Sequence, residues 1–221
     1  MMSTWSVVVE YTPRVPDDSD ARATLEAAIR AACDVRDWKT AATLGIRGYG
    51  DELLGYLGAL LRDESDAADA FAIVCTKIWK TLLAFRWDCS FRTWAYTVAR
   101  NAGLTIVRDP YRRKRSDIED AEVSGIAAEI RSRTATYLRT ETKDRFAEAR
   151  ASLAPDDQTL LVLRINRGLS WREVARVLGD ASDDGSEEPS DAELGKRAAA
   201  LRKRFERLKE ELRAQLARQG T

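Results

Sequence analysis

The chain of 221 residues contains no histidine, and this absence excludes several kinds of chemistry. Ser-His-Asp and Cys-His catalysis need an imidazole base, and histidine phosphorelays need the same side chain. Imidazole-ligated zinc, iron or copper would lack its usual ligand. The three cysteines, Cys33, Cys75 and Cys89, are too far apart for a CxxC pair and odd in number for a disulfide framework. We therefore expect free thiols in a reducing compartment, no metal and no cofactor.

Long apolar runs and a secretory leader are missing as well. No segment approaches the roughly 18 consecutive apolar residues of a membrane span. The first ten residues have no basic segment ahead of their short apolar stretch, so they do not resemble a secretory signal. We expect a cytoplasmic chain with no membrane partner, built from helices in one or two domains.

Neither sign of charge is in excess overall, but positive and negative residues are segregated along the chain. The 36 Lys and Arg balance 36 Asp and Glu, a net of zero that argues against nucleic acid. Residues 108–115 nevertheless carry a net +4, residues 180–193 carry −7, and residues 196–218 carry +6. Either basic run alone could be a solvated helix face, but two of them, each at the end of a helical unit, favour contacts with nucleic acid.

Apolar residues recur at spacings of three and four through the first half of the chain. The pattern predicts helices within 21–38, 40–61, 66–83 and 91–107, with Asp66 as the N-cap of the third. These helices form a predicted first domain at 21–108, preceded by a flexible arm at 1–20 with a short strand near 7–9. We interpret 109–145, which is polar and charge-mixed, as a linker with a weak helix around Ile126 and Ile130.

The second half of the chain has strong helix start and stop signals. Pro155 suits a first helical turn, and Gly168 suits a left-handed cap. Capping boxes at Ser170–Glu173 and Ser190–Glu193 begin a short helix and a long final one. Between them lies an acidic insertion at 180–189. The predicted fold is all-α: two small helical domains, 21–108 and 146–221, joined by a partly helical linker.

Two short helices joined by a glycine turn and followed by a basic helix are typical of a helix-turn-helix. The residues we expect to contact DNA in this domain are Ser170, Trp171, Arg172, Lys196, Arg197, Arg202, Lys203, Arg204 and Arg207. The alternative is a bundle helix with solvated arginines.

The first domain carries aromatics interleaved with arginines. Phe85, Trp87, Phe91, Trp94 and Tyr96 alternate with Arg86, Arg92 and Arg100, and the basic run Arg112–Arg115 follows. Single-stranded bases stack on aromatic faces and their backbone attracts cations, so the pattern favours single-stranded DNA. Ordinary core packing is the alternative for Phe91, Trp94 and Tyr96.

The string FRWDCSFRTWAYTVARN, residues 85–101, resembles region 2.3 of sigma-70 family RNA polymerase sigma factors, closest to the extracytoplasmic-function group. Residues 66–79 resemble region 2.2. Residues 153–179 resemble region 4.1 and the first half of region 4.2, and residues from 200 onward resemble the recognition helix. The resemblance covers about two thirds of the chain in the family's order.

The resemblance implies a factor that binds core RNA polymerase and directs promoter recognition, and that is not itself an enzyme. Region 2.2 would dock on the polymerase clamp through Asp66, Asp69, Lys77 and Trp79. The −10 element would be held by Arg86, Trp87, Asp88, Cys89, Ser90, Arg92, Trp94, Arg100, Asn101, Arg112, Arg113, Lys114 and Arg115. The second domain would read the −35 element, and acidic linker residues such as Glu119, Asp120 and Glu122 would mimic nucleic acid. An anti-sigma protein is a further candidate partner.

Two features depart from the family. Region 2.2 usually has Gln-Glu where this chain has Ala72 and Ile73, so part of the polar contact with polymerase is missing. The acidic insertion at 180–189 could fold back on the basic final helix, or be a plain flexible insertion. If the insertion does fold back on the final helix, deleting residues 181–189 should raise DNA affinity at low salt.

The main alternative function is a helix-turn-helix regulator that does not engage polymerase. A carboxylate hydrolase is less well supported, since no phosphate-binding glycine loop is present and histidine is absent. A helical adaptor, which would bind no DNA, is a further alternative.

Overall fold

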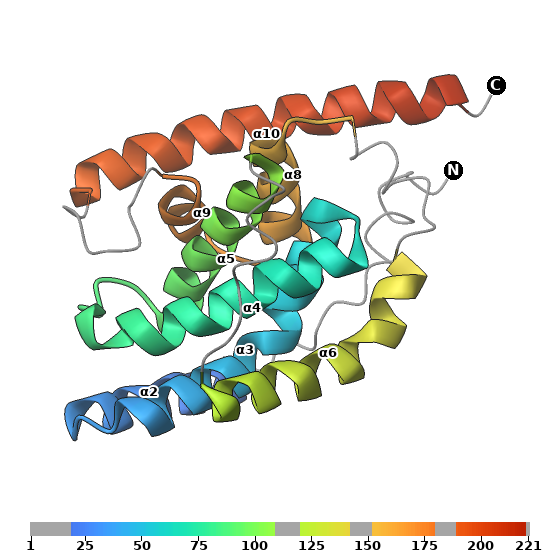
Figure 1. Ribbon diagram of the computed structural model, residues 1–221. Coiled ribbons are helices and arrows are strands. Elements are labelled where there is room, and N and C mark those ends of the chain that lie inside the picture. The colour runs from blue at the N-terminus through green and yellow to red at the C-terminus, as the bar shows by residue number, and fades with distance from the viewer. Residues whose placement is uncertain (1–18, 109–119, 142–151, 180–188, 220–221) are drawn as a thin grey trace.

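The computed structural model describes residues 19–108, 120–141, 152–179 and 189–219, and within these ranges helices joined by loops are the regular secondary structure (Figure 1). The all-α prediction is therefore confirmed. The predicted arm, the basic run Arg112–Arg115 and most of the acidic insertion lie outside the described residues, as does the short strand expected near residues 7–9. None of the described helices combines the length and the apolar character that crossing a membrane requires.

The first four helices are α2 (Ser19–Asp34), α3 (Trp38–Leu61), α4 (Glu64–Thr81) and α5 (Phe91–Arg108), with a 3-10 turn at Leu82–Ala84 after α4. Helix α3 packs against α2, α4 and α5, so it forms the centre of this bundle. Large side chains such as Tyr56, Phe71 and Phe91 are buried there. The predicted N-cap of α4 is wrong by three residues: Asp63 caps the helix and accepts from the backbone N–H of Asp66.

Helix α6 (Ala121–Glu141) occupies the segment for which the sequence predicted only a weak helix in a linker. It packs against α3 and α4 (Figure 1), and Val123, Ile126, Ala127 and Ile130 are buried. Arg133 and Thr134 of α6 both bind the carboxylate of Asp51 on α3. The sequence reading missed Val123 and Ala127, which complete an i, i+3, i+4, i+7 stripe with the two isoleucines.

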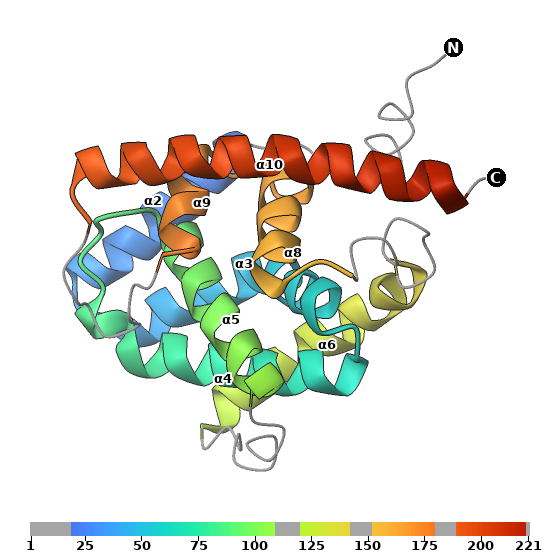
Figure 2. The same cartoon turned by 90° about the horizontal axis from the view of Figure 1, so that it is seen from above.

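The remaining helices are α8 (Pro155–Leu161), continued by a π-helical turn at Val162–Asn166, then α9 (Trp171–Val177) and α10 (Asp191–Gln219). Pro155 begins α8, Gly168 has a φ of +66°, and both capping boxes form, as the sequence predicted. Helix α10 runs across α8 and α9 as one long rod (Figure 2), with Leu194, Phe205, Leu208 and Leu212 buried on its inner face.

The helix-turn-helix part is packed directly on the first bundle. Helix α9 contacts α5, and α8 contacts α3. Buried apolar residues from both parts form one continuous cluster, and the hydroxyls of Tyr56 and Thr159 meet inside it at 3.0 Å. The domain boundaries at 108 and 146 stay a prediction, but in this conformation the two predicted domains share a core.

Candidate nucleic-acid interface

The loop between α4 and α5 presents an aromatic and basic surface. Trp87 has a left-handed φ of +62°, stacks against Phe85 with ring centroids 4.9 Å apart, and lies under the guanidinium of Arg30. Arg86 is exposed and donates to Asp88 at 3.1 Å. Trp87, Cys89 and Ser90 are half-buried. A half-exposed indole next to cations can stack on a nucleic-acid base.

The other aromatic residues predicted to bind single-stranded DNA differ in how far they are buried. Phe91 and Tyr96 are fully buried, which confirms the core alternative for these two. Trp94 is half-buried and stacks on Phe85 with centroids 5.0 Å apart. Phe85, Trp87 and Trp94 are therefore the aromatic residues of this segment that solvent can partly reach.

Helix α5 is capped by a local side chain and by a distant one. The Ser90 hydroxyl accepts from the Thr93 backbone N–H at 3.1 Å. The carboxylate of Glu26, on α2, accepts from the backbone N–H groups of Phe91 and Arg92 at 2.8 and 2.9 Å. The Tyr49 hydroxyl donates to the same carboxylate, and burial raises the pKa of that hydroxyl. An anion at a helix N-terminus satisfies free N–H groups and favours the helix dipole. Ser90 and Glu26 together fix where the arginine-bearing helix begins.

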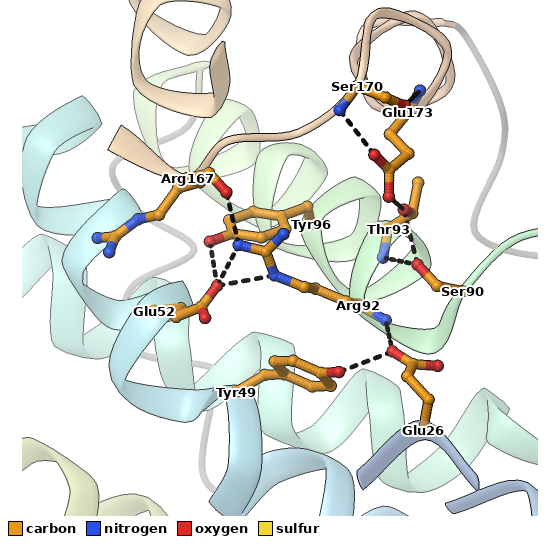
Figure 3. A network of polar contacts seen from close by, with 10 residues as sticks. All are labelled: Glu26, Tyr49, Glu52, Ser90, Arg92, Thr93, Tyr96, Arg167, Ser170 and Glu173. Carbon is orange, nitrogen blue, oxygen red and sulfur yellow. Dashed lines mark hydrogen bonds and ion pairs between the residues drawn. The ribbon is translucent and has the colours of Figure 1, made fainter. Parts of the chain in front are cut away.

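Arg92 is the centre of the polar network that Figure 3 shows. Its side chain is only 5% exposed, and its guanidinium donates twice to Glu52 of α3, at 2.9 and 2.7 Å. It also donates to the backbone carbonyl of Arg167, in the turn before α9, at 2.9 Å. The Tyr96 hydroxyl donates to Glu52 as well, and burial raises its pKa, so it stays a neutral donor. Each of these hydrogen bonds joins two groups of the protein, in a largely buried setting.

Two further residues of α5 reach the helix-turn-helix part. The Thr93 hydroxyl donates to Glu173 of α9 at 3.2 Å, and Glu173 also accepts from the Ser170 backbone in the capping box. Arg100, 7% exposed, donates to Asp156 of α8 at 2.7 Å. Of the residues predicted to contact −10 DNA, Arg92 and Arg100 therefore point at the second part of the chain. Asn101 is half-buried, and Arg112–Arg115 lie outside the described residues.

The partners of these three α5 side chains, Arg92, Thr93 and Arg100, are residues that the sequence analysis did not select. Glu52, Asp156 and Glu173 stand 40, 56 and 80 residues from the side chains they bind. No local spacing connects residues so far apart, so only the folded chain reveals the pairs.

The basic final helix presents the second candidate surface. The exposed cations on α10 include five that were predicted to contact DNA: Lys196, Arg197, Arg202, Lys203 and Arg207. Arg204 differs, since it is half-buried and forms an ion pair with Asp157 of α8. Trp171 packs on Phe205 and lies near the guanidiniums of Arg164 and Arg202, while exposed Arg172 pairs with Asp191. Ser170 is used as the N-cap of α9.

The four residues predicted to bind polymerase lie on α4. Asp66, Asp69, Lys77 and Trp79 are all half-buried, and Trp79 packs against the core. Ala72 of the same helix is 7% exposed. Nowhere in the described ranges do three or more acidic or cysteine side chains gather in a way that could hold a metal ion.

An all-helical chain with a helix-turn-helix and an aromatic, arginine-rich loop has the features of a DNA-binding transcription protein. Residues 46–116 match the model of the family described as Sigma-70 region 2, which spans most of α3, α4 and α5. The RNA polymerase sigma-H factor of Pseudomonas aeruginosa is 30% identical over 146 residues, 63% of this chain and 76% of that relative. The RNA polymerase sigma factor YlaC of Bacillus subtilis is 28% identical over 134 residues, 60% of this chain and 76% of its own length. No solved structure is a significant match. The chain belongs to the sigma-70 family of RNA polymerase sigma factors.

Proposed function

We propose that this sigma factor is of the extracytoplasmic-function type, with a first domain that opens the −10 element and a second that reads the −35 element. Sigma factors act with core RNA polymerase at promoters and are not themselves enzymes. The observation that carries the division of labour is the position of the Arg86–Ser90 loop. It lies inside the matched region 2 and presents a half-exposed indole among cations.

We assign recognition of the −10 element to the Arg86–Ser90 loop and to Trp94 near the start of α5. Capturing a base from a duplex costs a few kcal/mol of unstacking, and stacking on an aromatic face offsets about 1–3 kcal/mol of it. Trp87 and Trp94 supply such faces, and Arg86 and Arg30 supply charge beside them. The −35 reading is assigned to α10, where arginine can recognise guanine edges in the major groove with two hydrogen bonds.

Polymerase binding is assigned to α4, with Asp69 as its central acidic residue. We expect the purified chain to co-elute with bacterial core RNA polymerase in gel filtration, and the pair to give run-off transcripts from genomic fragments. Asp69→Arg should weaken co-elution about tenfold or more, since reversing a charge at an interface introduces repulsion. Asp34→Arg, the same substitution at the exposed end of α2, is the matched control and should bind as the unaltered chain does.

Failure of the unaltered chain to co-elute would contradict polymerase docking by this chain. The helix-turn-helix regulator that does not engage polymerase would then be the better description. The replacement of the family's Gln-Glu by Ala72 and Ile73 is the observation that makes this test necessary, because Ala72 is buried and offers polymerase no polar group.

The cellular location of the chain and a further candidate partner, an anti-sigma protein, follow from the same proposal. Since core RNA polymerase works in the cytoplasm, we propose the cytoplasm as the location of this chain. An anti-sigma protein would be recovered by co-purification from the native host, bound to the factor in place of polymerase.

A further inference from the structure

Helix α2 places two charged side chains against the start of α5 and the loop before it. The Glu26 carboxylate accepts from the backbone N–H groups of Phe91 and Arg92 at 2.8 and 2.9 Å (Figure 3). One turn further along α2, the guanidinium of Arg30 lies over the indole ring of Trp87, with its Cζ 5.3 Å from the ring centroid. Residues four apart in a helix share one face, so a single face of α2 holds both the loop and the helix that follows it.

Trp87 is kept in an unusual backbone conformation by its neighbours. Its φ of +62° lies in the left-handed region, which favours glycine and strains a residue that has a side chain. Strained residues persist only where surrounding contacts fix them, and they gather at binding sites. Phe85, with ring centroids 4.9 Å apart, and Arg30 supply such contacts to the indole. The loop is therefore preformed around a ring that solvent can partly reach.

The contact with Trp87 leaves the hydrogen-bonding capacity of Arg30 unused. A guanidinium carries five N–H donors. Arg30 is exposed, and within the part of the chain that the structure describes its guanidinium forms no hydrogen bond and no ion pair. Arg86 of the loop differs, because it donates to Asp88 at 3.1 Å. Arg30 is thus a cation that an aromatic ring holds in place while its donors stay open to a ligand.

We propose that Arg30 is a further DNA-binding residue of this sigma factor, positioned by Trp87 to donate to a phosphate of the −10 single strand. The proposal rests on the proposed function of the Arg86–Ser90 loop and extends it to α2, which lies outside residues 46–116 that match region 2. Sites for single strands combine aromatic faces for the bases with cations that follow the backbone. An arginine fork donates to phosphate with two parallel hydrogen bonds, so the unused donors of Arg30 fit this ligand.

The salt dependence of binding separates a phosphate contact from a role in packing. Fluorescence anisotropy over a salt series would give the affinity of the full chain for a labelled, mixed-sequence DNA single strand. Each phosphate contact with a single strand contributes about 0.7 to the slope of log affinity against log salt. We expect Arg30→Ala to reduce that slope by about 0.7 and to lower the affinity about threefold or more at low salt. A residue that only packs against the loop would lower the affinity and leave the slope unchanged.

Two variants control for charge and for position. Arg30→Lys keeps the charge and loses the planar fork, so it should keep the slope of the unaltered chain. Arg36→Ala removes an arginine that is likewise exposed but lies beyond the end of α2, and it should leave both slope and affinity unchanged.

A double-mutant cycle tests the positioning by the indole. Trp87→Gly removes the ring at a backbone position that suits glycine. Because the ring holds Arg30 in place, Arg30→Ala should have a smaller effect on affinity in that background than in the unaltered chain.

The proposal is overturned if Arg30→Ala changes the slope no more than Arg36→Ala does, or if its effect is the same with and without the indole. It is also overturned if the unaltered chain does not bind the single strand. Failure of the proposed function gives a different result. In that case Arg30→Ala reduces the slope as expected, yet core polymerase does not co-elute with the unaltered chain.

Discussion

Burial controls the chemistry of individual side chains in this protein, and the cysteines show it most clearly. Cys75 lies on α4 with no exposed surface, and burial raises the pKa of its thiol to about 12. Burial also raises the pKa of the Cys33 thiol. Cys89, in the loop assigned to −10 DNA, is only half-buried. Cys75 is buried because it lies on the apolar face of α4 together with Phe71, Val74 and Ile78.

The raised pKa of Cys75 predicts a loss of stability in alkaline solution. The unfolded thiol ionises near its ordinary pKa of about 8.5, while the folded thiol keeps its proton to about 12. Stability is therefore complete below about pH 8.5 and falls as pH rises, by up to about 1.4 kcal/mol per pH unit for this one group. Burial raises the Tyr56 pKa to about 12 and adds to the effect.

Urea unfolding of the unaltered chain and of Cys75→Ala between pH 8 and 11 measures the contribution. We expect the variant to be less stable at pH 8, because it leaves a small cavity, but to lose less stability as pH rises. Parallel pH dependences for the two chains would contradict the assignment.

Individual helices are positioned by glycines that allow close approach. Gly45 of α3 faces the ring of Phe91 on α5, and Gly50 of α3 faces Ile130 of α6. A side chain at either position would overlap atoms that are fully buried. These two contacts let α5 and α6 lie against α3, so they fix the distance of the arginine-bearing helix from the centre of the bundle.

Alanine at Gly45 should destabilise the protein, although alanine is the better helix former. The added methyl group meets a buried ring that has no free space, and overpacking of this kind costs about 1–3 kcal/mol. Gly125 of α6 is the matched control, because nothing lies within 4 Å of the position its Cβ would take. Gly125→Ala should stabilise by about 0.5–1 kcal/mol. Thermal unfolding of both variants tests the pair, and a stabilised Gly45→Ala would show that Phe91 has room to move.

At the scale of the whole molecule, charges that cancel in total are segregated along the chain. The cations of α10 divide further: Lys203 is exposed, whereas Arg204 is paired with Asp157 of α8. The net charge of zero therefore conceals a basic helix whose charges are not equally available to DNA.

This difference predicts how salt affects binding to duplex DNA. Removing one phosphate contact should reduce the slope of log affinity against log salt by about 1. We expect Lys203→Ala to show that reduction, and Arg204→Ala to show a clearly smaller one because its charge already serves Asp157. Fluorescence anisotropy over a salt series measures both slopes. Equal reductions would mean that Arg204 leaves Asp157 to bind DNA.

Much of the secondary structure could be predicted because its causes are local. The apolar spacing of α5, the proline that begins α8 and the capping boxes of α9 and α10 each act within a few residues, and the structure confirms them. The N-cap of α4 was misplaced because Asp63 and Asp66 are both acceptable caps on local grounds. Helix α6 was underestimated because its residues have little apolar character except where they meet α3 and α4.

By itself, the sequence determined the all-α class, the helix-turn-helix and the family, since periodicity, caps and the string from Phe85 to Asn101 are written along the chain. Only the tertiary structure decided what the arginines of α5 do in the free protein. Arg92 and Arg100 bind groups from α3, α8 and the turn before α9, which lie 40 to 75 residues away. A buried guanidinium needs a partner in space, and which distant segment supplies that partner depends on packing of the whole chain.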